Sequence, residues 1–254
     1  SSTAANCAGS CDGMATIGIT GGVGPFDFTW SPAPGAGQGT SQATGLCPGS
    51  YDILVHDQGG CDATFSVLIT APAPLLVTAV VANITCAGQC DGSISLDVQG
   101  GTGPHTYTWT PAPPAGQGSS VISNLCPGNF QVEVVDANGC DTTLHFNIIE
   151  PAPLVLSGSA TMSHCALCDG TAAVQVSGGT GAHTTQWTLA GTPVGTGDAL
   201  TGLCAGIYSA GVTDAQGCAA SMVLVVPDDN AEQVQAVDGQ TLCASSCDGG
   251  VGVA

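Results

Sequence analysis

The sequence contains no lysine and no arginine, although it is 254 residues long. Its 19 aspartates and glutamates therefore give a net charge of −19 at pH 7. Binding to a phosphate backbone needs cations, so nucleic acid is excluded as a partner, and an anionic membrane surface is disfavoured. The absence also removes every cleavage site for trypsin-like proteases, which suits an exposed surface polymer.

The chain also lacks the features that would indicate a membrane span, a helical fold or an enzyme. No stretch approaches the roughly 18 apolar residues of a membrane span. The 38 glycines and 15 prolines would interrupt any helical period. None of the common hydrolase, zinc-protease or phosphate-loop motifs is present, so we expect no catalytic residues and no enzymatic activity.

What the sequence does contain is a repeat of 79, 79 and 78 residues, opened in turn by Cys7, Cys86, Cys165 and Cys243. Such a period is typical of a tandem array. We expect repeat 1 over 1–73, repeat 2 over 74–152, repeat 3 over 153–228, and the start of a fourth repeat over 229–254. The polar start is no signal peptide, and the last residues stop in mid-strand. We therefore expect a piece of a longer protein.

Each repeat has short β-branched and aromatic runs between glycines and prolines. In repeat 2 they lie at 75–81, 93–99, 105–110, 121–125, 130–136 and 142–149. About seven short strands in under 80 residues favour an all-β fold, a tandem array of immunoglobulin-like antiparallel β-sandwich domains, disulfide-stapled. Repeat 1 lacks a counterpart of the 75–81 strand.

One tryptophan per repeat follows the glycine turn: Trp30, Trp109 and Trp187. A core position beside a disulfide is expected, and the alternative is an exposed platform that stacks on sugars. Proline pairs at 71–74 and 150–153 stiffen the joints between repeats, which predicts a semi-rigid array. Further prolines after the tryptophan strand of repeats 1 and 2 predict a protruding loop, and these loops offer a contact surface for a glycan or protein.

Fourteen cysteines divide as four per complete repeat and two in the partial fourth. This is typical of a disulfide framework made in an oxidising compartment, so we expect an extracellular protein. Four cysteines allow three pairings. An adjacent pair would close a tight loop that constrains little, so both are expected to reach across the repeat. The favoured bridges are Cys7 to Cys61 and Cys11 to Cys47, Cys86 to Cys140 and Cys90 to Cys126, and Cys165 to Cys218 and Cys168 to Cys204.

Two alternatives concern the remaining cysteine chemistry. A zinc site with four thiolates usually has two closely spaced pairs, whereas the second pair here is 14 residues apart. Cys243 and Cys247 have no partners in the sequence. They would belong to the next domain of a longer polypeptide, or the segment that carries them would dock on a neighbouring subunit in a head-to-tail polymer.

Recurring aspartates lie in the turn before the last cysteine of each repeat: Asp57, Asp136 and Asp214. Aspartate often shapes a turn by bonding to its own backbone. The functional alternative is calcium, which prefers clustered oxygens, although no known calcium-loop motif is present. No other cofactor is expected. Asn83 heads a single N-glycosylation sequon.

The order of motifs from Leu75 to Pro153, with its Asp-Gly-Ser, Gly-Gly-Thr-Gly-Pro, Leu-Cys-Pro-Gly and Asp-Ala-Asn-Gly-Cys elements, resembles the SprB-type repeat of Bacteroidetes cell-surface adhesins. The resemblance implies tandem repeats in very long secreted proteins, including gliding-motility adhesins exported by type IX secretion. It also implies pairing of the cysteines that match Cys86 and Cys140. Asp141-Thr142-Thr143 resembles the O-glycosylation site of such surface proteins, with Thr142 as acceptor.

These observations together predict a structural stalk or filament segment of a cell-surface adhesin. Its partners would be neighbouring repeats. The alternatives are a glycan- or protein-binding module that uses the proline loops and aromatics, and a subunit of a head-to-tail extracellular polymer.

Overall fold

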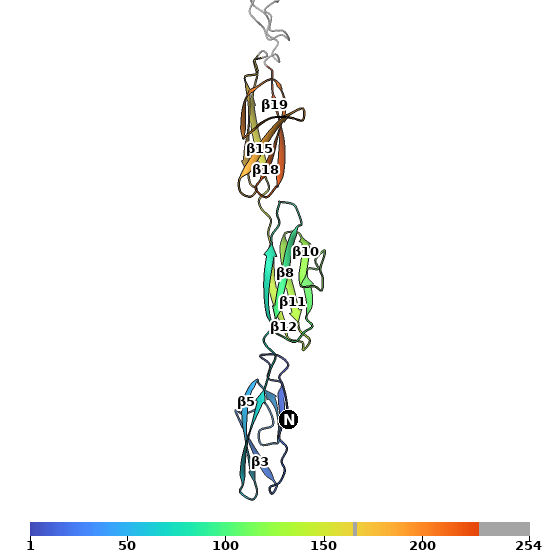
Figure 1. The fold of residues 1–254 in the computed structure, drawn as a ribbon, viewed down its shortest axis with the longest axis vertical. Coiled ribbons are helices and arrows are strands. Elements are labelled where there is room, and N and C mark those ends of the chain that lie inside the picture. The colour runs from blue at the N-terminus through green and yellow to red at the C-terminus, as the bar shows by residue number, and fades with distance from the viewer. Residues whose placement is uncertain (165–166, 229–254) are drawn as a thin grey trace, which may run out of the picture. The chain divides into compact units, whose positions relative to one another are not determined.

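The computed structural model describes residues 1–164 and 167–228, and these residues form strands and loops (Figure 1). Hydrogen bonds join the strands into six antiparallel sheets, two in each of the three complete repeats. The prediction of an all-β, immunoglobulin-like sandwich array is therefore confirmed. No helix in this described part of the chain is long and apolar enough to cross a membrane.

Repeat 1 has one sheet in the order β1-β2-β4 and a second in the order β3-β5-β6. The strands are β1 (Ser2–Thr3), β2 (Gly13–Thr16), β3 (Phe26–Ser31), β4 (Gln42–Leu46), β5 (Gly49–Asp57) and β6 (Asp62–Ile69). β1 pairs Ser2 with Ala15 and Thr3 with Met14. Repeat 1 thus keeps two residues of the first strand that the sequence was expected to lack altogether.

Repeat 2 has the sheets β10-β8-β7 and β12-β11-β9. Its strands are β7 (Leu76–Ala82), β8 (Gly92–Gln99), β9 (Thr106–Thr110), β10 (Val121–Leu125), β11 (Gly128–Val135) and β12 (Asp141–Ile148). Alternate residues of β11 are buried, because successive side chains of a strand point to opposite faces of its sheet. Each predicted run of repeat 2 overlaps one strand, and the bounds differ by at most two residues.

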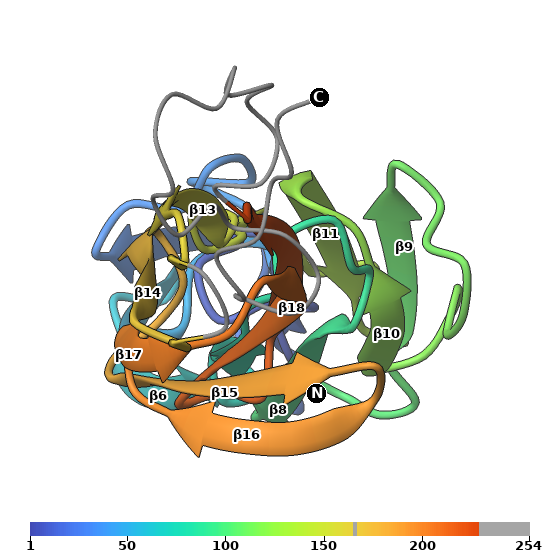
Figure 2. The same cartoon turned by 90° about the horizontal axis from the view of Figure 1, so that it is seen from above.

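Repeat 3 has the sheets β13-β14-β17 and β16-β15-β18-β19. Its strands are β13 (Val155–Thr161), β14 (Gly170–Ser177), β15 (His183–Leu189), β16 (Thr192–Thr196), β17 (Ala199–Leu203), β18 (Gly206–Asp214) and β19 (Ala219–Val226). The additional strand β16 lies beside β15 in Figure 2. It stands where repeats 1 and 2 have their proline loops. A tight turn through Ala190 and Gly191, both with positive φ, connects the two strands.

The core of each sandwich is built around its tryptophan. Trp30, Trp109 and Trp187 are at most 2% exposed, and each indole N–H donates to a backbone carbonyl ten residues later, at 2.7–3.0 Å. In repeat 2 the accepting loop depends on Gly116, whose φ is 93° and where a Cβ would lie 2.1 Å from the Val121 carbonyl oxygen. The buried rings confirm the core position and leave no exposed indole platform for sugars.

The described chain divides into two compact units that do not follow the repeat boundaries. One unit holds Ser1–Ala82 and Gly92–Ile148, and the other holds Asn83–Asp91 together with the chain from Ile149. The loop Asn83–Asp91 lies between β7 and β8 of repeat 2, yet it is grouped with repeat 3. The first loop of repeat 2 therefore belongs to the surroundings of repeat 3.

We expect Trp109→Phe to lower the free energy of unfolding by about 2–4 kcal/mol, because it leaves a cavity and the Ser119 carbonyl loses its donor. Denaturant titration with a fluorescence or circular-dichroism readout measures the change. Tyr107→Phe, on the same strand, is the matched control and should cost less than about 1 kcal/mol. Equal effects of the two substitutions would contradict the central role of the indole.

Candidate functional site: the cysteine junctions between repeats

The first cysteine pair of each repeat lies in a loop that we call the opening segment: residues 6–12 in repeat 1 and 85–91 in repeat 2. In repeat 1, Asp12 orders this loop by accepting bonds from the Asn6 backbone N–H at 3.0 Å and from the Ser10 hydroxyl at 2.7 Å. The Ser10 hydroxyl bond is the main cause of the lowered pKa of Asp12. In repeat 2, Asp91 accepts from the Thr85 backbone N–H at 3.0 Å. The recurring aspartate therefore preorganises the loop.

The second cysteine of each opening segment, which we call the inner cysteine, is Cys11 in repeat 1 and Cys90 in repeat 2, and Cys168 is its counterpart in repeat 3. The structure pairs Cys11 with Cys47 and Cys168 with Cys204, the partners that the sequence favoured. Cys90 and Cys126 are both disulfide-bonded. The Cys11–Cys47 bridge thus fastens the opening segment of repeat 1 to its own sandwich, and the Cys168–Cys204 bridge likewise lies within repeat 3.

The first cysteine of each segment, the outer cysteine, pairs differently from the prediction. Cys7 is bonded to Cys140 of repeat 2, with a Cα–Cα distance of 5.7 Å, and not to Cys61. Cys86 is bonded to Cys218 of repeat 3, with a Cα–Cα distance of 5.5 Å, and not to Cys140. The expected Cys165 to Cys218 bridge is wrong for the same reason, and Cys165 itself lies outside the described residues. Each outer cysteine thus links its repeat to the next one.

The predicted pairing of the outer cysteines is wrong because of the length of one strand. In repeat 1, β5 runs from just after Cys47 to just before Cys61. At about 3.3 Å per residue, the nine residues of this strand separate its two ends by roughly 26 Å. A disulfide needs Cα atoms within about 7 Å, so an opening segment that bonds Cys47 cannot also reach Cys61. β18 separates Cys204 from Cys218 in the same way.

The partner of each outer cysteine lies in a turn that we call the closing turn, which contains Asp57 and Cys61 in repeat 1, Asp136 and Cys140 in repeat 2, and Asp214 and Cys218 in repeat 3. The three aspartates are buried, between 6% and 7% exposed. In each turn the N–H of the cysteine donates to the aspartate carboxylate at 2.8–2.9 Å. The same carboxylate accepts a second N–H from the glycine turn 34 residues earlier, at 2.7–3.1 Å.

These backbone donors hold the pKa of all three aspartates below the ordinary value. For Asp57 the Cys61 N–H is the main cause and the Val23 N–H the next. For Asp214 the Thr180 N–H is the main cause. Burial raises the pKa of Asp136, but N–H groups that include those of Thr102 and Cys140 outweigh it. The ionised carboxylates are therefore structural parts of the closing turns.

Contacts beside the disulfides seat the opening segment on the closing turn. The Asn6 carbonyl oxygen lies 3.4 Å from Cys140 Sγ, and it accepts a bond from Asn138 Nδ2 at 3.0 Å. At the junction of repeats 2 and 3, the Thr85 carbonyl oxygen lies 3.3 Å from Cys218 Sγ. The Gly88 N–H also donates to the Glu150 carboxylate at 2.7 Å. The residue before each outer cysteine thus contacts the closing cysteine in both junctions.

The two links have a consequence for chain connectivity. Three stretches of chain run between the Cys7–Cys140 disulfide and the Cys86–Cys218 disulfide: residues 7–86, 86–140 and 140–218. A single backbone break in any of these stretches leaves the rest covalently joined. Bridges within each repeat would not give this property.

The other predicted sites have less support from geometry. The closing-turn carboxylates are occupied by backbone amides, and the described residues contain no group of three histidine, cysteine or acidic side chains that could hold a metal ion. Calcium at Asp57, Asp136 and Asp214 stays a prediction. Asn83 is exposed, and its side-chain oxygen accepts the Ile149 N–H at 3.2 Å. Thr142 lies half-buried in β12. Glycosylation of either residue also stays a prediction, and Cys243 and Cys247 lie outside the described residues.

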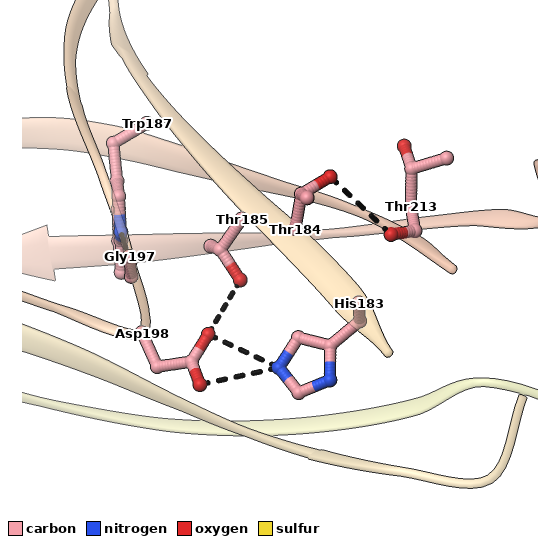
Figure 3. A network of polar contacts seen from close by, with 7 residues as sticks. All are labelled: His183, Thr184, Thr185, Trp187, Gly197, Asp198 and Thr213. Carbon is pink, nitrogen blue, oxygen red and sulfur yellow. Dashed lines mark hydrogen bonds and ion pairs between the residues drawn. The ribbon is translucent and has the colours of Figure 1, made fainter. Parts of the chain in front are cut away.

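Repeat 3 carries a separate polar network, shown in Figure 3. The Thr185 hydroxyl donates to Asp198 at 2.6 Å, and His183 Nε2 lies 3.1 Å from the same carboxylate. The Thr185 bond is the main cause, and the His183 bond the next, of the lowered pKa of Asp198. Because the hydroxyl is bonded to the carboxylate and not to the imidazole, the network is arranged to hold the β16–β17 loop on β15, not to activate a nucleophile.

The comparisons with known sequences agree with this repeat structure. Residues 1–35 and 78–113 match the family model described as SprB repeat. Two segments of the chain are thus SprB-like. They fill corresponding positions in repeats 1 and 2 and contain both opening segments whose outer cysteines form the links. The resemblance noted in the sequence is confirmed for these segments. No curated protein matches the chain.

Among solved structures, the chain is similar to several multidomain proteins, among them the immunoglobulin domains of DSCAM and Sidekick-1. The three N-terminal domains of the bacteriophage RB49 Highly Immunogenic Outer Capsid protein are 13% identical with a TM-score of 0.45, over 89% of this chain and 94% of that one. The N-terminal eight Ig domains of DSCAM isoform 1.30.30 are 15% identical with a TM-score of 0.42, over 89% and 36%. Sidekick-1 immunoglobulin domains 1–5 are 12% identical with a TM-score of 0.34, over 80% and 52%. The chain thus spans about a third of the DSCAM structure and about half of the Sidekick-1 structure.

The depressed pKa values of the closing-turn aspartates predict acid sensitivity. A carboxylate whose pKa is lower in the folded state stabilises the fold above the ordinary aspartate pKa of about 4, and this contribution is lost as pH falls toward the folded-state value. We expect the free energy of unfolding to fall as pH drops below about 4, and to fall less steeply in Asp136→Asn. Urea titrations at a series of pH values measure both slopes. An unchanged acid slope in the variant would contradict the role of Asp136.

The links between repeats can be tested with a single new protease site. Because the chain has no lysine or arginine, Thr70→Arg, at an exposed position between β6 and β7, creates one trypsin site. We expect the cleaved, denatured protein to stay in one piece without reductant, and to give residues 1–70 and 71–254 after reduction. Mass spectrometry or a denaturing gel measures this.

The control combines Thr70→Arg with Cys140→Ser, which removes the link from repeat 1 to repeat 2. In this variant trypsin should release residues 1–70 without reductant. If the single variant already releases that fragment, Cys7 is not joined to repeat 2.

Proposed function

We propose that this chain is a structural segment of an extracellular cell-surface adhesin, a stalk that transmits force along a tandem array of repeats. The observation that carries the proposal is the pair of disulfides Cys7–Cys140 and Cys86–Cys218, which join successive repeats. A load on such an array meets a covalent bond at each junction in addition to the main chain. The function is mechanical and steric, not catalytic.

The SprB-like segments and the sandwich fold support an extracellular, adhesin-like repeat. Disulfides persist in oxidising compartments, so the four described bridges also favour a location outside the cell. The resemblance would further place the protein among Bacteroidetes surface proteins exported by type IX secretion, with gliding motility as one role. These finer points are part of the proposal.

Two features of composition suit an exposed stalk. The absence of lysine and arginine removes the sites of trypsin-like proteases, and the net charge of −19 discourages association between neighbouring stalks. Where another protease does cut between the two links, three parallel stretches keep the array connected. Partners at the stalk's tip, whether glycans or proteins, stay predictions.

Pulling the oxidised protein by its ends tests the mechanical role. In the reduced chain, about 210 residues separate Cys7 from Cys218. In the oxidised chain, the shortest stretch between the two links runs from Cys86 to Cys140, so roughly 150 residues do not contribute to the extended length. At about 3.4 Å per residue, the oxidised chain should be at least about 500 Å shorter at full extension than the reduced chain. Single-molecule force spectroscopy with and without reductant measures the difference.

Two variants sharpen the test. Replacing Cys7, Cys86, Cys140 and Cys218 by serine should lengthen the oxidised chain. Replacing Cys11 and Cys47 by serine is the matched control and should leave the length unchanged, because the shortest covalent path does not pass through that bridge. If the four-serine variant extends no further than the wild type, the links do not limit extension and the stalk proposal loses its main support.

A further inference from the structure

The closing turn of repeat 1 has the same local structure as the two closing turns that hold a partner. The Cys61 N–H donates to the Asp57 carboxylate at 2.8 Å, as the Cys140 N–H does to Asp136 and the Cys218 N–H does to Asp214. The glycine turn closes on Asp57 through the Val23 N–H at 3.1 Å, as it does in the other two repeats. Repeat 1 thus presents a turn that is formed in the same way as the occupied ones.

The difference lies in the thiol. Cys140 and Cys218 are half-buried and disulfide-bonded to the opening segment of the preceding repeat. Cys61 is free and exposed. Within one chain, two equivalent positions therefore bind an opening segment, and the third has the same backbone scaffold with its sulfur accessible.

A hollow of about 240 Å³ adjoins Cys61. Its lining includes Asp57 and the apolar side chains of Ile19, Phe26, Val55 and Phe65. Phe65 is 43% exposed. The exposed sulfur therefore lies beside apolar side chains that a polypeptide loop carrying a second cysteine can cover.

We propose that the closing turn of repeat 1 is a docking site for the opening segment of another repeat of this kind, and that Cys61 forms a disulfide with the outer cysteine of that segment. The closing turn of repeat 1 would recognise the same features that the opening segments present in the two observed junctions. An aspartate-ordered loop presents a cysteine, and the preceding carbonyl oxygen lies about 3.3–3.4 Å from the closing sulfur. Small residues follow the cysteine in both observed segments, Ala8-Gly9 and Ala87-Gly88.

The reaction joins two thiols. They lose two protons and two electrons to a disulfide oxidant of the extracellular compartment, which is reduced to two thiols. The inference goes beyond the stalk proposal, because it depends on the repeated geometry of the closing turns and holds even if the array bears no load.

Disulfide mapping of the protein purified from its native source is the decisive experiment. Free thiols are blocked with N-ethylmaleimide before any reduction, and the unreduced protein is digested with pepsin, since trypsin has no site. We expect the Cys61 peptide to be joined to a peptide with the outer cysteine of a Cys-x-x-x-Cys-Asp-Gly or similar opening segment. A mass that falls on reduction places this segment on a second molecule, and an unchanged mass places it in the same polypeptide; either result supports the docking site.

Three results would overturn the proposal: Cys61 labelled by maleimide, Cys61 joined only to a small thiol such as glutathione, or Cys61 joined to Cys7. Cys61→Ser gives an independent readout, since the outer cysteine that had been its partner should become accessible to maleimide. Cys47→Ser is the matched control, and it should expose Cys11 while that outer cysteine stays protected. Because these readouts concern bonding and not extension, they can fail without affecting the pulling experiment, and the reverse also holds.

Discussion

The disulfide between the outer cysteine of one repeat and the closing cysteine of the next is the constraint on which the rest of the array depends. It requires two preformed surfaces. Asp12 and Asp91 order the opening segments by binding backbone N–H groups, and Asp136 and Asp214 order the closing turns in the same way. These four carboxylates order their loops without a lysine or arginine partner, because their donors are backbone N–H groups together with the Ser10 hydroxyl and the Asn6 side-chain amide at Asp12. A chain without lysine and arginine can still use its acidic residues to build rigid loops.

The two cysteines of an opening segment have different partners, and this explains their close spacing. The inner cysteine fastens the segment to its own sandwich, as Cys11 does through Cys47, and the outer cysteine reaches the next repeat, as Cys7 does through Cys140. Without the inner bridge, the outer one would join a repeat to a loop that could be pulled away from its strands. Without the outer bridge, the inner one would stabilise a sandwich that is tied to its neighbour by the main chain alone. Both are needed for a covalent path that passes through folded domains.

Most of the fold could be predicted because it is determined within one repeat. The alternating pattern of β11, the buried position of Trp109 and the inner bridge of Cys11 all depend on residues fewer than 80 positions apart. The outer bridges could not be predicted from counts, since shifting a partner by one whole period changes neither the number nor the order nor the spacing of cysteines. The signal that was overlooked is the strand between Cys47 and Cys61. A strand of that length places the two cysteines at opposite ends of the sandwich, and adjacent cysteines cannot reach both ends.

The cross-links also explain why the array needs so little core. Each sandwich has one tryptophan and a few buried aliphatic side chains, and aromatic residues make up only 4% of the chain. Cross-links that close loops of 36 residues within a repeat, and of 132 and 133 residues between repeats, lower the entropy of the unfolded chain in place of a larger apolar interior. The two disulfide-closed loops, residues 7–140 and 86–218, overlap. The unfolding of one sandwich therefore cannot lengthen the array while the other stretches between the two links stay folded. Stability and limited extension then arise from one set of bonds. This is a physical reason for the outer cysteine to form its disulfide with the next repeat and not within its own.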